Sequence, residues 1–282
     1  MSETRIVASA NAQIRCQSFG HPDDPALLLM MGQMASMLWW PEELCERLAA
    51  TGRFVIRYDN RDTGLSTSYP PGEPPYVAAD LAADAVAVLD GHGLDAAHLV
   101  GMSMGGALAQ IVALTRPERV LTLTLISTTL ADDTNGVLPG PTDRYLEHMK
   151  AGEEVDWSDP HAIGAYIVTD AEELASTRHG FDSAATIEFV HTDLQRARSP
   201  QSLINHAMLP SDEDAPGALA DIDAPTLVIH GNADPMLPVA HGEALATAIP
   251  GAALLVIEGG GHELHPGDWD EYVQAIAEHT AA

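Results

Sequence analysis

The sequence predicts an α/β protein with a mostly parallel central sheet, covered by helices on both faces and interrupted by a helical insertion. Three observations support this fold class. Short runs that are apolar throughout alternate with helical patterns, as expected for parallel strands buried on both faces. A glycine-flanked serine joins one such run to a helix. The alternation stops between residues 129 and 223, where helical patterns occur without a convincing strand.

Strands and helices are expected in a regular order. Strands are predicted over 26–31, 54–58, 98–100, 121–126, 225–230 and 252–257. Helices are predicted over 41–52, 77–91, 104–115 and from 268 onward. Pro41 suits a first helical position, and Gly52 ends that helix. Asp268 has capping-box spacing to Glu271. The predicted organisation is a core of residues 1–128 and 224–282 with a lid-like helical cap of 129–223.

Composition and charge exclude several classes of protein. The net charge of −28 repels phosphate backbones and anionic membranes, which disfavours binding to nucleic acid or membrane. The start of the chain lacks signal-peptide features, and no run approaches the ~18 apolar residues of a membrane span. Cys16 and Cys45 do not form a disulfide scaffold pattern. We expect a cytoplasmic protein, and its oligomeric state stays open.

One serine stands in a pattern typical of nucleophiles. Residues 101–105 read Gly-Met-Ser-Met-Gly, between the apolar run 98–100 and the helix that begins at Met104. A sharp strand-to-helix turn crowds the backbone, and Gly101 and Gly105 relieve that crowding. The turn presents the Ser103 hydroxyl at the N-terminus of a helix, as in a nucleophile elbow. The alternative is a glycine-rich turn with a capping serine.

A serine nucleophile requires a base and an acid that orients the base. The expected chain order is serine, acid, histidine. Asp234 follows the strand 225–230 in a loop that begins with Gly231. His262 follows the strand 252–257 after three consecutive glycines, which permit a tight loop. Ser103, Asp234 and His262 are therefore the predicted catalytic triad.

Neighbouring residues could fill two of these roles instead. His265 could replace His262 as the base, and Asp132 or Asp133 could supply the acid. His230 is expected to pack or form a hydrogen bond at the end of its strand. The segment His-Glu-Leu-His at 262–265 lacks the His-Glu-x-x-His spacing of zinc enzymes. No metal and no cofactor is expected.

Two backbone amides are expected to stabilise the oxyanion. One is the amide of Met104, and the other is the amide of Gln33, where Gly32 permits the necessary turn. An apolar substrate pocket is expected near these groups. The candidate lining residues, about half of which we expect to be core instead, are Met34, Met37, Trp39, Trp40, Met102 and Leu237.

These features together resemble the α/β-hydrolase superfamily over nearly the whole chain. Segments 53–67 (RFVIRYDNRDTGLST), 80–93 (DLAADAVAVLDGHG) and 225–235 (PTLVIHGNADP) resemble the aclacinomycin methylesterase group. The resemblance implies a helical cap at 129–223 and hydrolysis of a methyl ester on an aromatic polyketide by Ser103, Asp234 and His262. The chain departs from the pattern at Met31, where His is common, and at Gln33, where the group has Gly.

The expected function is that of a cofactor-free serine esterase for a neutral, hydrophobic small molecule. A lactonase, a carbon–carbon bond hydrolase or a perhydrolase-like enzyme would use the same triad. A ligand receptor that retained the fold is the alternative from another class. Arg61, in the segment DNRDTG, is expected to fix a loop by ion pairing rather than to take part in catalysis.

Overall fold

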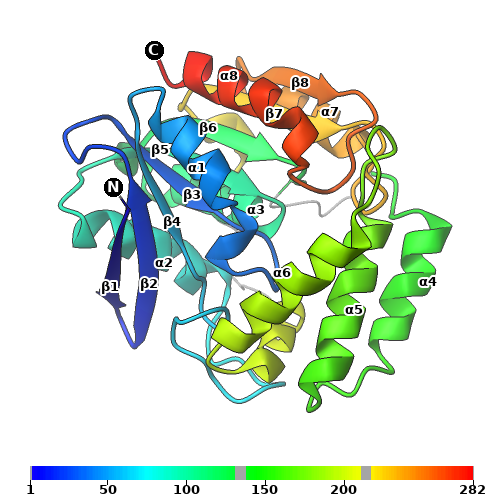
Figure 1. Cartoon of the computed structure of the whole chain (residues 1–282). Coiled ribbons are helices and arrows are strands. Elements are labelled where there is room, and N and C mark those ends of the chain that lie inside the picture. Colours follow the sequence, from blue (N-terminus) through cyan, green and yellow to red (C-terminus); the bar gives the residue numbers. More distant parts are fainter. Residues whose placement is uncertain (1, 131–137, 211–216, 282) are drawn as a thin grey trace.

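The computed structural model describes residues 2–130, 138–210 and 217–281 of the chain, and these form a layered α/β structure around one sheet (Figure 1). The sheet has the order β1-β2-β4-β3-β5-β6-β7-β8. Its strands are β1 Glu3–Ser9, β2 Ala12–Phe19, β3 Ala26–Met30, β4 Phe54–Tyr58, β5 Ala97–Met102, β6 Val120–Ile126, β7 Thr226–Gly231 and β8 Ala253–Ile257. The last six are mutually parallel. The predicted fold class and the six predicted strands are confirmed.

The hairpin of β1 and β2 was not predicted. It pairs antiparallel with β4 at one edge of the sheet. Along β1 buried and exposed residues alternate, and Ile6 is 51% exposed. The two strands meet at Ala10, which has a φ of +42° although it is not glycine. A search for wholly apolar runs misses such an edge hairpin, because only one of its faces is buried.

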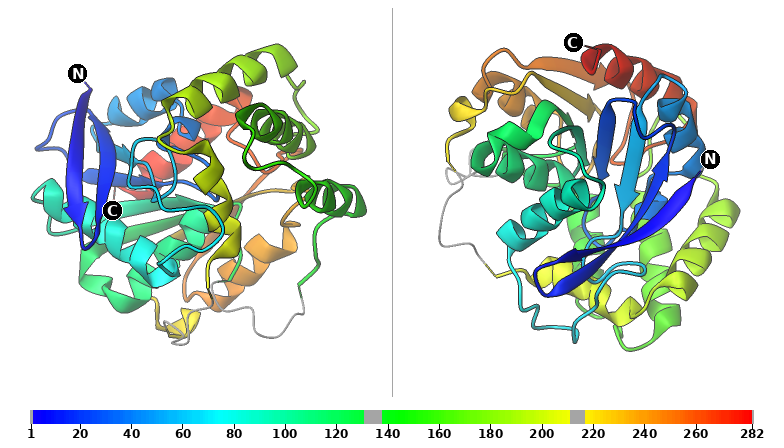
Figure 2. Two further views of the ribbon diagram at one scale, coloured as in Figure 1. Left: turned by 90° about the horizontal axis from the view of Figure 1, so that it is seen from below. Right: turned by 90° about the vertical axis from the view of Figure 1, so that its left-hand side faces the viewer.

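Helices cover both faces of the sheet (Figure 2). They are α1 Glu42–Ala49, α2 Ala78–Gly91, α3 Met104–Thr115, α7 Ala240–Ala248 and α8 Trp269–His279. Buried residues of α1 and α8 pack together against one face. Buried residues of α2, α3 and α7 pack against the other. Helix α7 was not predicted. No helix within the described residues is long and apolar enough to cross a membrane.

Two predicted helix starts need correction. Pro41 precedes α1 as its N-cap instead of being its first residue. Asp268 does precede α8, but its side chain makes no capping hydrogen bond, so the capping-box prediction is wrong. The Asp268 carboxylate instead accepts a hydrogen bond from His179 Nε2 at 2.8 Å. The Asp268 carboxylate therefore bonds to a side chain that is distant in sequence, and not to a backbone N–H in the first turn of α8.

The insertion forms a helical layer beside the sheet (Figures 1 and 2). It contains α4 Asp143–Gly152, α5 Pro160–Glu173, α6 Ser183–Arg196 and the 3₁₀ segment Pro200–Met208. Its apolar cluster consists of Ile163, Val190, Leu194 and Leu203. The described part of 129–223 contains no strand. We call this insertion the cap, and its division from the core at 129 and 223 stays a prediction.

Candidate active site

Ser103 lies in a strained turn between β5 and α3. Its φ of +52° and ψ of −122° are unfavourable for a residue with a Cβ atom. A Cβ atom at Gly101 would overlap the Gly105 carbonyl group, and one at Gly105 would overlap the Met30 carbonyl group. Only glycine therefore permits this close approach on either side of the serine. Thr128 stabilises the turn by donating its hydroxyl to the Ser103 carbonyl oxygen at 2.7 Å.

Asp234 and His262 form a buried hydrogen-bonded pair. His262 Nδ1 lies 2.7 Å from Asp234 Oδ2, and the side chains are 5% and 0% exposed. The other carboxylate oxygen accepts the backbone N–H groups of Met236 and Leu237, at 2.9 and 2.8 Å. The carboxylate is thus held in place and aimed at the imidazole. With Nδ1–H donated to Asp234, Nε2 of His262 is left as a proton acceptor.

The three residues follow strands that run in the same direction. Ser103 follows β5, Asp234 follows β7 and His262 follows β8. In a parallel sheet the carboxyl ends of the strands meet at one edge, where ligands bind in open α/β sheets. The sheet topology therefore gathers the serine, the acid and the histidine on the same edge.

Glycines bring together the loop after β7, which carries Asp234 (the acid loop), and the loop after β8, which carries His262 (the histidine loop). A Cβ atom at Gly231 would overlap the Gly260 carbonyl group. The same carbonyl accepts the Ala233 N–H at 3.0 Å. The histidine loop is tight, as the three glycines predicted. The hydrogen bond between Ala233 and Gly260 joins it to the acid loop.

The cap holds the histidine loop from the other side. The His262 N–H donates to the Leu174 carbonyl at 2.8 Å, and a Cβ atom at Gly261 would overlap that carbonyl group. The Ser176 N–H donates to Glu263 Oε1 at 2.6 Å. Burial raises the pKa of the Glu263 carboxyl group, although the Ser176 bond acts against the shift. Residues after α5 thus fix the backbone on which His262 is mounted.

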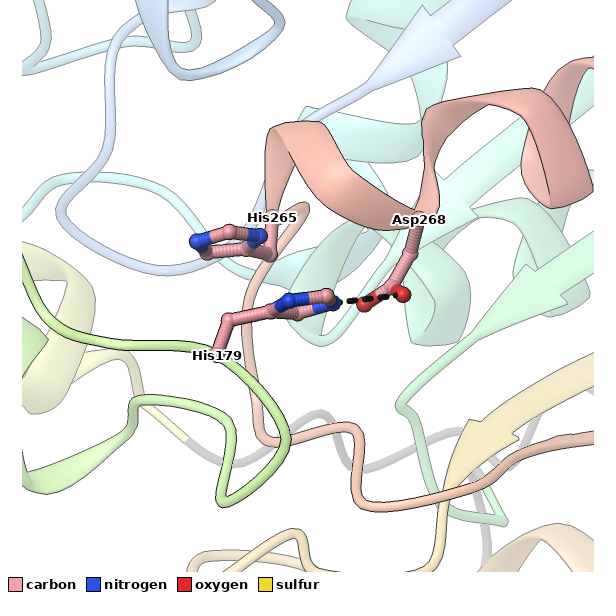
Figure 3. A group of neighbouring side chains, drawn as sticks. All are labelled: His179, His265 and Asp268. Atoms are coloured by element: carbon pink, nitrogen blue, oxygen red, sulfur yellow. Dashed lines mark hydrogen bonds and ion pairs between the residues drawn. The ribbon is translucent and has the colours of Figure 1, made fainter.

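His265 lies in a different environment. Its ring stacks on the His179 ring at 4.1 Å and 7°, while His179 is bonded to Asp268 (Figure 3). His265 Nδ1 accepts the Gly267 N–H at 3.0 Å. Three potential ligand atoms of this group lie within 4.8 Å of one another. Parallel rings direct their nitrogen lone pairs along parallel planes, so they do not converge on one ion as a tetrahedral site requires. The cluster is a contact between cap and core.

His230 packs at the end of β7, as the sequence predicted. Its Nε2 donates to the Leu237 carbonyl at 2.7 Å. Burial lowers the pKa of the His230 imidazole. Asp132 and Asp133, which the sequence also permits as the acid, lie outside the described residues.

The two predicted oxyanion amides belong to segments that lie close to Ser103, namely the start of α3 and the loop after β3. Met104 is the first residue of α3, so its N–H has no acceptor within the helix and lies at the positive end of the helix dipole. The loop 31–34 also approaches the nucleophile. A Cβ atom at Gly32 would lie 3.2 Å from Ser103 Cβ and 3.7 Å from its Oγ. The adjacent Gln33 side chain is exposed. The oxyanion roles themselves stay predictions.

Three of the residues predicted to line the substrate pocket are buried. Trp40 and Met102 belong to the core cluster beneath α1 and α8, and Trp40 is fully inaccessible. Met37 is also buried, and its N–H donates to Asp59 Oδ1 at 2.9 Å.

The other three are partly exposed. Met34 and Trp39 pack against the apolar cluster of the cap. Leu237 is half-buried in the acid loop. A role in substrate binding stays a prediction for all six residues.

A cavity of about 390 Å³ opens between the cap and the acid loop. It is lined by Thr142, Arg144, Glu172, Glu173, Ala175, Ser176, Thr177, Phe181, Ala233 and Pro235. Ser103, Asp234 and His262 do not line it. Its wall includes the charged residues Arg144, Glu172 and Glu173, and none of the six residues that the sequence predicted for the substrate pocket lines it.

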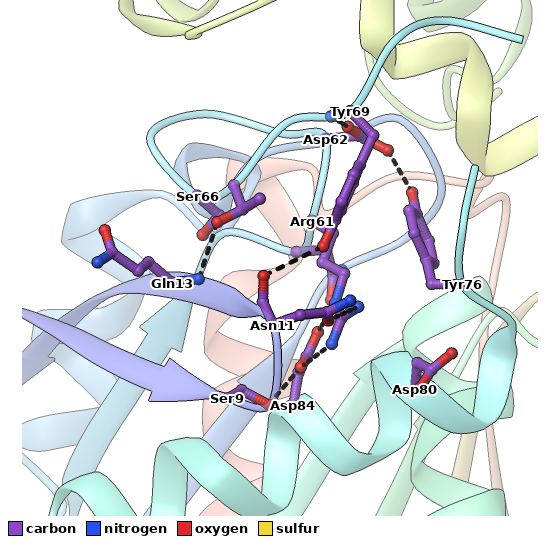
Figure 4. Close-up of polar contacts among 12 residues, drawn as sticks. Ser9, Asn11, Gln13, Arg61, Asp62, Ser66, Tyr69, Tyr76, Asp80 and Asp84 are labelled. Carbon is purple, nitrogen blue, oxygen red and sulfur yellow. Dashed lines mark hydrogen bonds and ion pairs between the residues drawn. The ribbon is translucent and has the colours of Figure 1, made fainter. Parts of the chain in front are cut away.

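Arg61 forms the structural ion pair that the sequence predicted. Its guanidinium donates to both oxygens of Asp84 at 2.7 and 2.8 Å, and both side chains are buried (Figure 4). Ser9 Oγ donates to the same carboxylate at 2.5 Å. Burial raises the pKa of Asp84, against the lowering effect of Arg61 and Ser9. This cluster joins the loop after β4 to β1 and α2.

Comparison with known proteins assigns the fold and this site to a class. A family model described as alpha/beta hydrolase fold matches residues 25–153, and one described as TAP-like protein matches residues 201–276. Rhodomycin D methylesterase DauP of Streptomyces sp. (strain C5) is 36% identical, over 99% of this chain and 98% of its own. The chain therefore belongs to the α/β-hydrolase family. Within it, the similarity to DauP places the chain in the aclacinomycin methylesterase group.

Other relatives include a protein named as an enol-lactonase and a hydrolase of known structure. 3-oxoadipate enol-lactonase 2 of Acinetobacter baylyi (strain ATCC 33305 / BD413 / ADP1) is 29% identical over 86% of this chain and 83% of its own. The crystal structure of a hydrolase from Pseudomonas aeruginosa PA01 has a TM-score of 0.71 at 26% identity, covering 98% of this chain and 96% of that one.

Proposed function

We propose that this carboxylic ester hydrolase cleaves the methyl ester of a neutral, hydrophobic, polyketide-like molecule through Ser103, His262 and Asp234. The observation that carries the proposal is the buried hydrogen bond of 2.7 Å between His262 Nδ1 and Asp234 Oδ2. The full-length similarity to a rhodomycin D methylesterase supports the choice of a methyl ester.

Each residue has a defined role in the proposed mechanism. Asp234 holds Nδ1–H of His262 and stabilises the imidazolium, so Nε2 takes the proton as Ser103 Oγ attacks the ester carbonyl. The N–H groups of Met104 and Gln33 stabilise the oxyanion. His262 then donates its proton to the leaving methanol. A water molecule activated by His262 hydrolyses the acyl-enzyme and releases the acid.

The charge and the cap support a neutral, apolar substrate. A net charge of −28 repels anions from the protein surface. Met34, in the loop that approaches Ser103, and Trp39 pack against the apolar cluster of the cap. Methionine side chains adapt to irregular flat ligands, because they are unbranched and polarisable.

A lactonase is the second candidate. The relative at 29% identity is named as an enol-lactonase, and ring opening of a lactone would use the same nucleophile, base and acid. The distinction depends on which carbonyl compound the space around Ser103 accepts.

A substrate comparison tests the proposal. We expect release of methanol from methyl esters of polycyclic aromatic acids, with a higher kcat/KM than for aliphatic and aromatic lactones. Gas chromatography measures the methanol, and p-nitrophenyl acetate serves as a reference for intrinsic reactivity. A consistently higher kcat/KM for the lactones would replace the methylesterase proposal with the lactonase.

The proposed role of Gln33 belongs to its backbone N–H. Gln33→Ala should therefore retain most activity on p-nitrophenyl acetate, since alanine supplies the same donor. Gln33→Pro removes the donor, and the loss of one oxyanion donor typically costs about 10²–10³ in kcat. Steady-state kinetics measures both, with circular dichroism as the control for folding. A folded and fully active Gln33→Pro protein would place the oxyanion hole elsewhere.

A further inference from the structure

Met34, the residue after Gln33, has an unfavourable backbone conformation. Its φ is +60°, in the left-handed region that residues with a Cβ atom rarely adopt. Such a conformation persists only where surrounding contacts maintain it. A contact that maintains the conformation of Met34 therefore also restricts the peptide group that joins Gln33 to Met34.

The contact comes from a buried histidine of the cap. His206 Nδ1 lies 2.9 Å from the Met34 nitrogen, and His206 Nε2 lies 2.7 Å from the Arg61 carbonyl oxygen. The side chain belongs to the segment Pro200–Met208 and is 4% exposed. His206 thus connects the cap to two loops of the core at once.

The two partners determine the tautomer of His206. A carbonyl oxygen only accepts hydrogen bonds, so Nε2 carries the proton that is donated to Arg61. Nδ1 is then unprotonated and accepts the Met34 N–H. Burial lowers the pKa of His206, while the Arg61 carbonyl and the Asp62 charge act in the opposite direction. The neutral ring that this arrangement requires is therefore favoured.

The cap segment has anchors that do not involve Met34. Asn205 Nδ2 donates to Asp62 Oδ2 at 2.9 Å, and Asn205 Oδ1 accepts the Gly72 N–H at 2.7 Å. Ser202 Oγ donates to the Tyr69 carbonyl at 2.6 Å. The segment can therefore stay docked when the bond between His206 and Met34 is removed, and the two effects can be separated by experiment.

We infer that His206 is a positioning residue for the oxyanion hole. By accepting the Met34 N–H, His206 holds the peptide group between Gln33 and Met34, so that the Gln33 N–H is aimed at the reacting carbonyl. The inference rests on the proposed function, in which the Gln33 amide stabilises the oxyanion. Gly32, on the other side of Gln33, already lies against Ser103. The loop is thus held by the nucleophile at one end and by the cap at the other.

A pair of matched variants tests the inference. In His206→Asn, the side-chain oxygen takes the place of Nδ1 and can still accept the Met34 N–H. In His206→Gln, the side-chain nitrogen takes the place of Nε2 and can donate to Arg61 but leaves Met34 unpaired. We expect kcat on p-nitrophenyl acetate to fall about 10- to 100-fold in His206→Gln, less than for outright loss of a donor. His206→Asn should stay within about threefold of wild type, and KM should change little in either variant.

Three different results would contradict the inference. Equal losses in both variants would show that His206 acts only through cap docking, and two wild-type activities would show that Met34 needs no partner. A larger loss in His206→Asn would assign the effect to the Arg61 bond. Ser103→Ala is assayed alongside. An active Ser103→Ala protein would refute the proposed function. If Ser103→Ala is inactive and the two His206 variants have equal activities, only the positioning role of His206 is refuted.

The wild-type protein supplies a test that is independent of how the variants fold. Nitrogen-15 NMR of the His206 ring should show a protonated Nε2 and an unprotonated Nδ1. The Met34 amide should exchange slowly with deuterium, because it is hydrogen-bonded to the buried His206 ring. A ring protonated at Nδ1 or a rapidly exchanging Met34 amide would overturn the inference.

Discussion

Ser103→Ala should fold normally and lose ester hydrolysis by roughly 10⁶-fold, as expected when the nucleophile of a catalytic triad is removed. The contacts that hold Ser103 in its turn use its backbone: its N–H donates to the Ile126 carbonyl at 2.9 Å, and its carbonyl accepts the Thr128 hydroxyl. Alanine keeps both contacts. Turnover of p-nitrophenyl acetate measures the loss, and circular dichroism verifies the fold.

Covalent labelling identifies the nucleophile directly. A fluorophosphonate should modify wild-type protein at Ser103, as located by peptide mass spectrometry, and should leave Ser103→Ala unmodified. Ser127 is a matched control, since it follows the adjacent strand β6, also has a positive φ and has a buried hydroxyl group. Ser127→Ala should be labelled like wild type. Labelling at Ser127 or another serine would refute the assignment of the elbow.

His262→Ala should be about as damaging as Ser103→Ala, because nucleophile and base act as a unit and removal of either disables the same step. The substitution leaves the His262 N–H bond to Leu174 in place. It removes the imidazole that Asp234 orients. Single-turnover and steady-state assays with p-nitrophenyl acetate measure the effect.

His265→Ala is the control for that experiment. His265 lies on the same loop, but its ring stacks on His179 at the cap contact. We expect kcat close to that of wild type, and a lower melting temperature where the loss of stacking weakens the contact. If His265→Ala were the inactive variant and His262→Ala the active one, the assignment of the base would be wrong.

Much of the fold followed from local pattern. A strand buried on both faces is mostly apolar, so the six parallel strands were visible as short apolar runs with few polar residues, such as Arg57 in β4 and Thr124 in β6. The turn at Ser103 needs glycine at positions 101 and 105, because neighbouring backbone leaves no space for a Cβ atom at either. The order of serine, acid and histidine along the chain then pointed to Asp234 and His262.

Other features could not be read locally, because their partners are distant in sequence. One face of the hairpin of β1 and β2 packs in the same apolar cluster as α2, which the residues of the hairpin alone do not reveal. Asp268 has capping-box spacing, but its carboxylate bonds to His179, 89 positions away. A local pattern indicates possible partners, whereas packing decides among them.

The amino-acid sequence thus determined the layered α/β fold, the elbow at Ser103 and the residues predicted as the triad, because each depends on local sterics or on the apolar runs of single strands. The tertiary structure alone decided how the cap meets these elements. The sequence contains 13 histidines, and nothing near His206 marks it as different. It is distinguished only by contacts with Met34, 172 positions away, and with the Arg61 carbonyl, 145 positions away. Such contacts form only when the cap packs on the core, since folding alone brings these distant backbone groups within hydrogen-bonding distance.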